Sequence, residues 1–276
     1  MLTTAVTPGS PNWLDLTSPD TADSATFYAT VLGWTFAAPD PEDGSHGLFR
    51  QYGRTVAAVG PVGADDGDPA WTISFCSLDV DRTAELVETA GGLVHTTASD
   101  AAATAAAAAV PLATLAEART LHCTDPTGAR FAVRQPGRTP GLEAVTEPGT
   151  FCWAECYSVD AEAAKAFYRA VFAWQEQDVP FGEAMYTVLT PAGGGTDDAH
   201  GGLMQLSPEH TAAGTGSHWL PYFEVPNVDA AVALAERLRA TVRTAPTDVH
   251  GVGRLAQLAD PYGAVFAVIT SAASSG

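Results

Sequence analysis

The sequence has few cysteines, only one lysine and no long apolar stretch. None of its four cysteines forms a Cys-x-x-Cys pair, which excludes the usual zinc and redox motifs of that spacing and favours reduced, buried thiols. No apolar stretch approaches the roughly 20 residues that cross a bilayer. The first residues carry neither the basic region nor the apolar stretch of a secretion signal. We therefore expect a soluble, cytoplasmic protein with no membrane partner.

Basic charge is scarce. The chain has 13 Lys and Arg against 32 Asp and Glu, a formal net charge of −19, and Lys165 is the only lysine. Long-range repulsion opposes the approach of such a surface to phosphate backbones and to anionic lipids. We therefore expect no nucleic-acid partner.

The most informative feature that is present is an internal repeat. A strand-like run containing an acid, a Phe-Tyr pair and a tryptophan occur twice, 140 residues apart at each landmark. The first copy has Trp13-Leu14-Asp15-Leu16, Phe27-Tyr28 and Trp34, and the second has Trp153-Ala154-Glu155-Cys156, Phe167-Tyr168 and Trp174. A period this long, with the same helix and turn signals in each copy, indicates duplicated domains rather than a solenoid.

A second pair of similar segments lies between these copies. Residues 71–75 with 125–133 correspond to residues 219–223 with 260–268, and each pair ends in an Asp-Pro-x-Gly turn followed by a strand. The chain is therefore interpreted as four modules, each a strand, a helix and two or three further strands. We predict an N-terminal domain over 1–136, a Pro- and Gly-containing linker over 137–148 and a C-terminal domain over 149–276.

Local signals place the helices. Asp20 and Asp160 are predicted N-caps, Gly33 is a predicted helix stop, and further helices are expected at about 79–90 and 227–240. Residues 191–196 and 207–216 are expected to be surface turns. The alanine-rich insertion at 100–115 is given no function.

The first and third modules have Phe-Tyr in their helices, and the second and fourth modules end in Asp-Pro-x-Gly-Ala-x-Phe. With these features the modules resemble the vicinal oxygen chelate superfamily. The sequence is most similar to its tandem glyoxalase/bleomycin-resistance-like proteins. This resemblance covers nearly the whole chain. It implies an α+β fold of four βαβββ modules paired into two half-barrel domains, each sheet curling round a ligand cavity with helices outside.

The resemblance also implies positions for metal ligands, early in the first strand of a module and late in its last strand. Here they fall on side chains that are poor metal donors: Trp13, Thr72, Ala132, Trp153, Leu220 and Ala267. Of the histidines, His200, His210, His218 and His250 lie mostly in glycine-rich loops without metal-binding spacing, and they are interpreted as solvated or hydrogen-bonded. We therefore expect neither a metal nor another cofactor.

Strand alternation identifies the side chains that share a face with the ligand positions. Asp15 and Glu155 lie two residues after Trp13 and Trp153, and Tyr157 follows Glu155 on the same face. We predict that ligand-binding residues form aromatic and polar cavity walls: Trp13, Trp71, Ser74, Trp153, Leu220, Tyr222 and Glu224. Such walls suit a small aromatic or polycyclic ligand with a few polar groups.

The predicted catalytic residues are Glu155, Asp15 and Tyr157. A carboxylate desolvated by aromatic walls should have a raised pKa, which would let it exchange a proton near neutral pH. Glu155 is favoured because Tyr157, and on this interpretation Glu224, lie near it. The alternative is structural: both carboxylates bind backbone amides or an arginine, and the tryptophans only pack.

Three functions fit these features. The first is a metal-independent isomerase, cyclase, lyase or hydrolase that acts on an aromatic or polyketide-like metabolite. The second is a non-catalytic drug- or metabolite-binding resistance protein. The third is a metal-dependent glyoxalase or dioxygenase. A monomer or a homodimer is expected, and the substrate, the reaction and the working cavity stay open.

Overall fold

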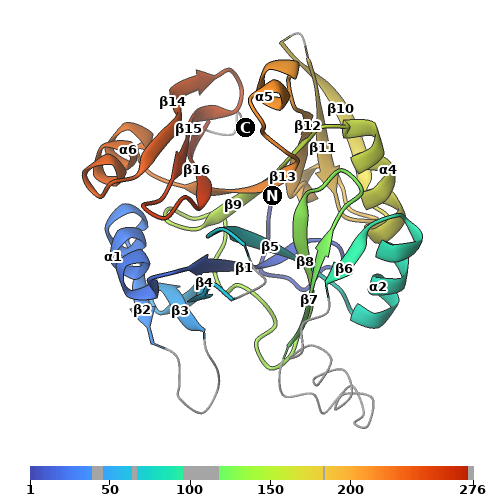
Figure 1. Ribbon diagram of the computed structural model, residues 1–276, viewed down its shortest axis with the longest axis horizontal. Helices are drawn as coiled ribbons and strands as arrows, with labels where there is room; N and C mark the ends of the chain where they lie inside the picture. Colours follow the sequence, from blue (N-terminus) through green and yellow to red (C-terminus); the bar gives the residue numbers. More distant parts are fainter. Residues whose placement is uncertain (39–45, 64–66, 96–117, 183, 273–276) are drawn as a thin grey trace. The chain divides into compact units, whose positions relative to one another are not determined.

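The computed structural model describes residues 1–38, 46–63, 67–95, 118–182 and 184–272 (Figure 1). The alanine-rich insertion at 100–115 lies outside these residues. The elements of the first half are β1 (Pro11–Ser18), α1 (Thr21–Leu32), β2 (Thr35–Ala37), β3 (Gly47–Gln51), β4 (Arg54–Pro61), β5 (Trp71–Cys76), α2 (Val80–Thr89), β6 (Leu93–His95), β7 (Arg119–Thr124) and β8 (Arg130–Gln135).

The second half repeats this order. Its elements are β9 (Phe151–Ser158), α4 (Ala161–Phe172), β10 (Gln175–Phe181), β11 (Ala184–Thr190), the 3-10 turn η2 (Thr196–Asp198), β12 (Gly201–Gln205), α5 (Pro208–Ala212), β13 (His218–Glu224), α6 (Val228–Arg237), β14 (Thr241–Val249), β15 (Gly253–Ala259) and β16 (Val265–Ser271). The short helix α5 lies inside 207–216, where we had expected only a turn. Ser207 caps this helix by accepting from the backbone N–H of His210. No helix in the described part of the chain is long and apolar enough to cross a membrane.

Each half forms one mixed eight-stranded sheet. The strand orders are β2-β3-β4-β1-β5-β8-β7-β6 and β10-β11-β12-β9-β13-β16-β15-β14. In both sheets the first strand of a module pairs in parallel with the last strand of the same module, as β1 does with β4 and β9 with β12. The predicted α+β fold of four βαβββ modules is therefore confirmed.

The predicted helix signals act as expected. The Asp20 carboxylate accepts from the backbone N–H groups of Ala22 and Asp23, and the Asp160 carboxylate accepts from that of Ala163. Helix α1 ends at Gly33, whose φ of 77° lies in the left-handed region that glycine adopts without strain. At the corresponding position after α4, Ala173 adopts a φ of 55°.

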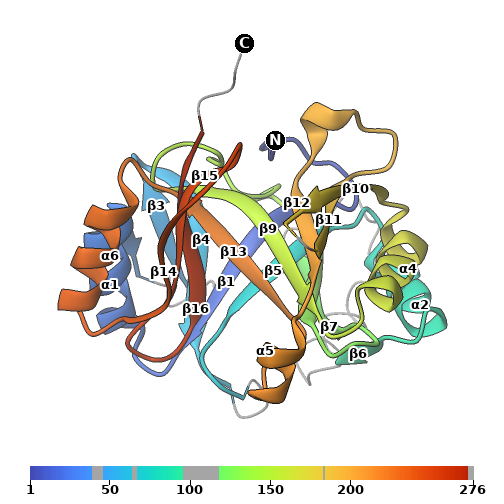
Figure 2. The ribbon, with the colours of Figure 1, turned by 90° about the horizontal axis from the view of Figure 1, so that it is seen from above.

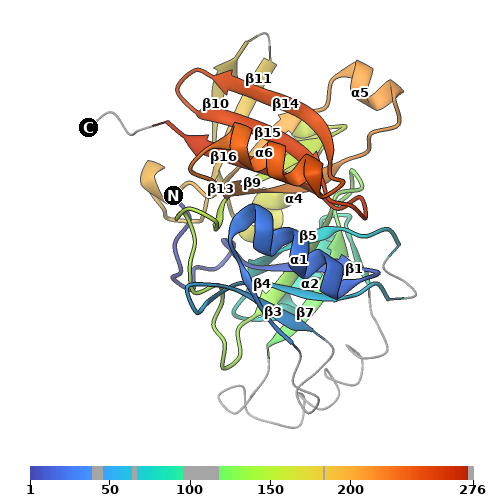
Figure 3. The same ribbon diagram turned by 90° about the vertical axis from the view of Figure 1, so that its left-hand side faces the viewer.

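The tertiary contacts group the modules across the repeat. One compact unit contains Met1–Trp13, Ile73–Gly141 and Ala154–Trp219, and the other contains Leu14–Thr72, Leu142–Trp153 and Leu220–Gly276. Within the first unit α2 contacts α4, and within the second α1 contacts α6 (Figures 1 and 2). Figure 3 shows α6 lying along β14, β15 and β16, which it also contacts. The domain boundaries at 1–136 and 149–276 remain a prediction, because the compact units follow a different division.

The landmark aromatic residues form the core of each unit. In the second unit the Tyr28 hydroxyl donates to Asp260 Oδ2 at 3.1 Å and accepts from Trp71 Nε1 at 2.9 Å. Trp34 stacks on Tyr28 with ring centroids 5.6 Å apart, and its Nε1 donates to the carbonyl of Gly149. Burial, followed by the charge of Asp260, raises the pKa of Tyr28 well above its usual range.

The first unit contains a matching arrangement. The Tyr168 hydroxyl donates to Asp125 Oδ2 at 2.9 Å and accepts from Trp219 Nε1 at 2.7 Å. Trp174 stacks on Tyr168 with centroids 5.0 Å apart and donates to the carbonyl of Gly9 at 2.7 Å. The Phe-Tyr and Asp-Pro-x-Gly signatures therefore meet in space, since the turn aspartate receives the helix tyrosine.

Candidate functional site

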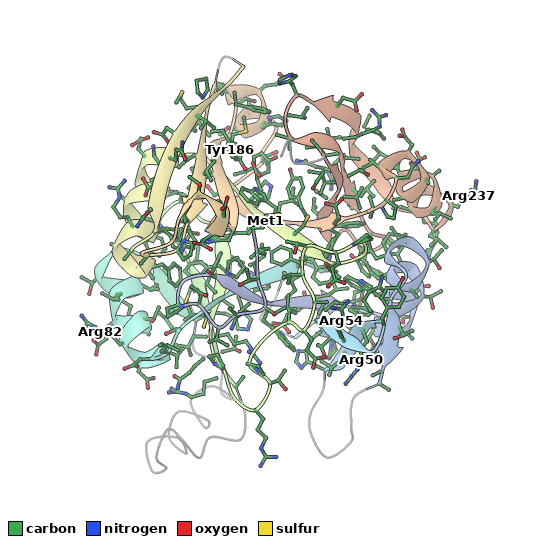
Figure 4. All side chains as sticks on the ribbon, turned by 180° about the vertical axis from the view of Figure 1, so that it is seen from behind. Met1, Arg50, Arg54, Arg82, Tyr186 and Arg237 are labelled. Atoms are coloured by element: carbon green, nitrogen blue, oxygen red, sulfur yellow. The ribbon has the colours of Figure 1, made fainter. Side chains whose placement is uncertain are left out.

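The strongest candidate site is built around Glu155 on β9, inside the first compact unit. Glu155 alternates with the fully buried Ala154 and Cys156, so its side chain leaves the opposite face of the strand. It is nevertheless only 5% exposed. Its Oε2 accepts a hydrogen bond of 2.9 Å from the hydroxyl of Tyr186, which comes from β11. Figure 4 marks Tyr186. The carboxylate and the phenol therefore form a hydrogen-bonded pair.

Gly202 makes room for this pair. It lies opposite Glu155 in the parallel β9–β12 ladder. A Cβ added to Gly202 would stand 1.9 Å from the Tyr186 hydroxyl oxygen, far inside van der Waals contact. A side chain on Gly202 would therefore displace the hydroxyl that binds Glu155, so we assign this glycine a spatial role.

Tyr157 continues the same face of β9. Its ring stacks on that of His218 with centroids 5.3 Å apart and an interplanar angle of 21°. His218 Nδ1 is 2.9 Å from the Gly216 carbonyl, and burial lowers the pKa of His218 below its usual value. At neutral pH this ring is therefore uncharged, and with Tyr157 it forms a flat aromatic surface.

Tyr186 and Gly202 were missed by the sequence reasoning. Alternation predicts which residues of β9 share a face, but it does not predict which residue of a neighbouring strand stands opposite them. The glycine pair at 201–202 directly before an apolar run was the available signal, since glycine inside a strand often marks a close approach by another group.

The candidates of the first half have different partners. Asp15 on β1 is partly exposed and stands opposite Ala58 in the β1–β4 ladder. In the first compact unit, Arg134 lies over the Trp13 ring, 4.4 Å from its centroid. The Arg134 guanidinium also donates to the carbonyls of Thr139 and Pro140. A buried arginine, which the sequence analysis did not assign, therefore contacts the predicted ligand-binding residue Trp13.

Ser74 and Trp71 lie on opposite faces of β5. Ser74 is fully buried, and its hydroxyl has no hydrogen-bond partner within the described residues. Trp71 shares the other face with Ile73 and Phe75 and is held by Tyr28 in the aromatic core, with the Phe223 ring 5.5 Å away. Trp71 therefore packs in the core on the face of β5 opposite Ser74, and its place in a ligand-binding wall stays a prediction.

The remaining predicted residues belong to the second compact unit. Leu220 and Tyr222 are buried on β13, and Trp153 on β9 is partly exposed. The Glu224 carboxylate accepts from the backbone N–H of Ser271 at 3.0 Å and from its hydroxyl at 2.5 Å. Glu224 therefore anchors β16, and its predicted role in ligand binding stays a prediction.

His200 differs most from its prediction. We had interpreted it as a solvated or hydrogen-bonded loop histidine, yet it is only 1% exposed. Neither ring nitrogen has a hydrogen-bond partner in the described part of the chain. Its ring meets Trp174 edge-on with centroids 5.0 Å apart. Burial lowers the pKa of His200 to about 3, so the ring is neutral at physiological pH.

Comparisons with known proteins agree with this architecture. Residues 10–133 match the "Glyoxalase/Bleomycin resistance protein/Dioxygenase superfamily", and residues 153–269 match a "Glyoxalase-like domain". The chain therefore belongs to the glyoxalase/bleomycin resistance/dioxygenase superfamily, with two of its domains in tandem.

Two relatives align over nearly their whole length. The anthracycline biosynthesis proteins DauV of Streptomyces sp. (strain C5) and DnrV of Streptomyces peucetius are each 34% identical over 281 residues, which covers 96% of this chain and 94% of theirs. The crystal structure of the Mn(II)-bound glyoxalase from Novosphingobium aromaticivorans superposes with a TM-score of 0.58 at 16% identity. That match covers 96% of this chain and 82% of the other, and it supports the fold alone.

The side chains at the family's metal positions do not fit a divalent cation. Ala132 and Ala267 are fully buried and pair with Ser74 and Tyr222 in the β5–β8 and β13–β16 ladders. A methyl group offers no lone pair to a metal. Within the described ranges no three His, Cys, Asp or Glu side chains come together as a metal-binding group. We therefore derive no metal-dependent step.

Proposed function

We propose that this protein is a metal-independent enzyme that binds an aromatic or polyketide-type metabolite and uses Glu155 to transfer a proton. The observation that carries the proposal is the hydrogen bond between the buried Glu155 carboxylate and the partly exposed Tyr186 beside Gly202. The names of DauV and DnrV, which place those relatives in anthracycline biosynthesis, support the substrate class.

The pair can perform acid–base chemistry. A carboxylate has about four lone-pair sites on its two oxygens, so Glu155 can accept a hydrogen bond from the Tyr186 phenol and also take a proton from an acidic C–H or O–H group. The Tyr186 hydroxyl fixes the orientation of the carboxylate. The Tyr157–His218 surface follows on the same face of the sheet and offers a flat ring a place to stack. Enolisation, cyclisation or dehydration of a polycyclic ketone needs this kind of proton transfer.

The Glu155→Gln variant tests the proposal. It keeps the size of the side chain and its ability to accept from Tyr186 but removes the base, so turnover should fall by about 10²- to 10⁴-fold. Affinity for a probe such as 1,8-dihydroxyanthraquinone, followed by tryptophan fluorescence, should stay within about tenfold. Turnover is measured by mass spectrometry on a panel of hydroxylated tricyclic and tetracyclic ketones.

Asp15→Asn is the matched control, since it makes the same change at the equivalent position of the first half. Loss of turnover in Asp15→Asn with normal turnover in Glu155→Gln would assign the chemistry to the other carboxylate. A second candidate function is a resistance protein that only binds its ligand. The Tyr157–His218 stack favours it, because stacking binds a flat ring without any proton transfer. This function predicts that wild-type protein binds the probe tightly and converts no member of the panel.

A further inference from the structure

A cavity of about 230 Å³ opens in the first compact unit, and its lining includes none of the residues assigned to proton transfer. It is lined by residues of the N-terminal segment, which include Thr3, Thr7 and Ser10, and by the loop that runs from Pro191 through Gly193 to Asp198. His200 completes the lining. Both segments and the histidine belong to the same compact unit, so the cavity is formed within one body.

His200 is the unusual member of this lining. Its ring is almost completely buried, and both nitrogens lack partners among the described residues. Buried polar atoms are nearly always paired, so an unpaired imidazole at the wall of a cavity indicates that something in the cavity bonds to it. The neutral ring presents one N–H donor and one acceptor nitrogen.

The first half shows that the fold itself does not need a histidine here. Glu155 stands opposite Gly202 in the β9–β12 ladder, and Asp15, the equivalent acid 140 residues earlier, stands opposite Ala58 in the β1–β4 ladder. His200 lies two residues before Gly202, so its equivalent is Val56, two residues before Ala58. Val56 is fully buried. An apolar side chain therefore satisfies the packing at the equivalent position, and the polar ring of His200 needs another explanation.

The lining also selects the charge of an occupant. Among these described lining residues Asp198 carries the only charged side chain, and its Oδ2 accepts from the backbone N–H of Gly195 at 2.8 Å. The ammonium group of Met1 is directed to the carbonyl of Asp197. The carboxylate of Asp198 and the ammonium group of Met1 together leave the lining without net charge, and the His200 imidazole is neutral, so an uncharged group that both donates and accepts hydrogen bonds suits the cavity best.

We propose that this cavity is a second binding site, for an uncharged hydroxyl-bearing small molecule or for the hydroxyl-bearing arm of a larger ligand, with His200 as its hydrogen-bonding anchor. The cavity is smaller than the roughly 300–1,000 Å³ of typical ligand pockets, which restricts the occupant to about one ring. This proposal does not depend on Glu155 being catalytic.

The test uses the full chain with any purification tag at the C-terminus, so that Met1–Ser10 is unaltered. Long-range proton–nitrogen NMR spectra of the seven histidine rings are recorded while phenol is added. The signal of His200 is identified by its loss in His200→Val. We expect both His200 nitrogens to shift in a saturable way. Anisole, which lacks the O–H donor, and benzoate, which is an anion, should bind at least about tenfold more weakly.

Two outcomes would overturn the proposal. If the His200 nitrogens do not respond up to the solubility limit of phenol, the cavity holds water only. If anisole or benzoate shifts them as well as phenol does, the hydroxyl is not recognised. If His200→Val folds poorly, His200→Gln identifies the His200 signal instead, and Thr7→Val is then the variant that should weaken phenol binding.

The matched controls separate this site from the proposed active site. His250→Val removes an exposed histidine and should leave the phenol response unchanged. Glu155→Gln should also keep the response of His200. A normal His200 response together with unaltered turnover in Glu155→Gln would therefore reject the proposed function while supporting this second site.

Discussion

The two compact units have similar aromatic cores but different side chains at the predicted ligand-facing positions, Glu155 and Asp15. Tyr28, Trp71 and Asp260 in one unit form the same hydrogen-bonded chain as Tyr168, Trp219 and Asp125 in the other, with donor–acceptor distances of 2.9 and 3.1 Å against 2.7 and 2.9 Å. The repeated residues of the sequence are therefore mainly those that build the fold.

The wall positions differ between the two halves. Glu155 faces Gly202 and bonds to Tyr186, whereas Asp15 faces Ala58. In the first half it is Gly60 that lies under another side chain, because a Cβ on Gly60 would meet the His46 ring at 2.3 Å. The comparison indicates that the duplicated modules kept their packing while the surfaces available to ligands became chemically distinct.

The largest expected difference between the two halves is in the pH dependence of stability, which His200 should affect and the equivalent Val56 should not. The unfolded chain takes up a proton on this histidine near pH 6.5, whereas the folded chain does so only at about pH 3. The stability that the neutral His200 contributes is therefore complete above pH 6.5. It falls as the pH is lowered, by about 1.4 kcal/mol per pH unit and by about 5 kcal/mol in total at pH 3. The free energy of unfolding in urea, measured from pH 7 to pH 4, checks this.

His200→Val copies the residue of the first half and should flatten that slope. The difference between wild type and variant isolates this one group from the other titrating residues. An equal pH dependence in both proteins would show that His200 is protonated in the folded state, and the comparison with Val56 would then lose its energetic basis.

The cores should respond alike to the loss of a hydroxyl. Tyr28→Phe and Tyr168→Phe each leave a buried indole N–H and a carboxylate oxygen without their partner, so each should cost about 1–3 kcal/mol of unfolding free energy. The two losses should differ by less than either loss itself. A large loss in only one variant, measured by chemical denaturation, would contradict the similarity of the cores.

The smallest expected effect tests the difference between the surroundings of Glu155 and those of Asp15. Gly202→Ala should displace the Tyr186 hydroxyl and lower turnover by about tenfold, which corresponds to about 1.4 kcal/mol of transition-state stabilisation. Ala58→Gly, at the equivalent position of the first half, should leave turnover unchanged. Kinetics on the substrate found with the ketone panel, with Tyr186→Phe as reference, measures both. Equal effects of the two changes would remove the proposed distinction between the halves.

Local sequence signals predicted the modules well because caps and turns are determined by neighbouring residues. Asp160 caps α4, and Asp125 Oδ1 accepts from the backbone N–H groups of Thr127 and Ala129 within its own turn. The second oxygen of Asp125 binds Tyr168, a partner 43 residues away that no local pattern identifies.

The candidate site was predicted only in part. Alternation correctly placed Glu155 and Tyr157 on one face, but it gave no register between β9, β11 and β12, so Tyr186 and Gly202 were missed. Trp71, also predicted to bind a ligand, packs in the aromatic core and donates to Tyr28, a partner 43 residues away that no local pattern identifies. The burial of His200 depends on the N-terminal segment and Trp174, which lie far from it in the sequence.

The division of the compact units has a consequence for how the chain can be cut. A fragment that ends within 137–148 keeps Tyr28 but lacks Asp260, and the complementary fragment keeps Tyr168 but lacks Asp125. Neither fragment can complete an aromatic core by itself, so each should be expressed as an aggregating or poorly structured polypeptide. Mixed together, the two fragments should recover native circular dichroism, because each supplies the acid that the other lacks.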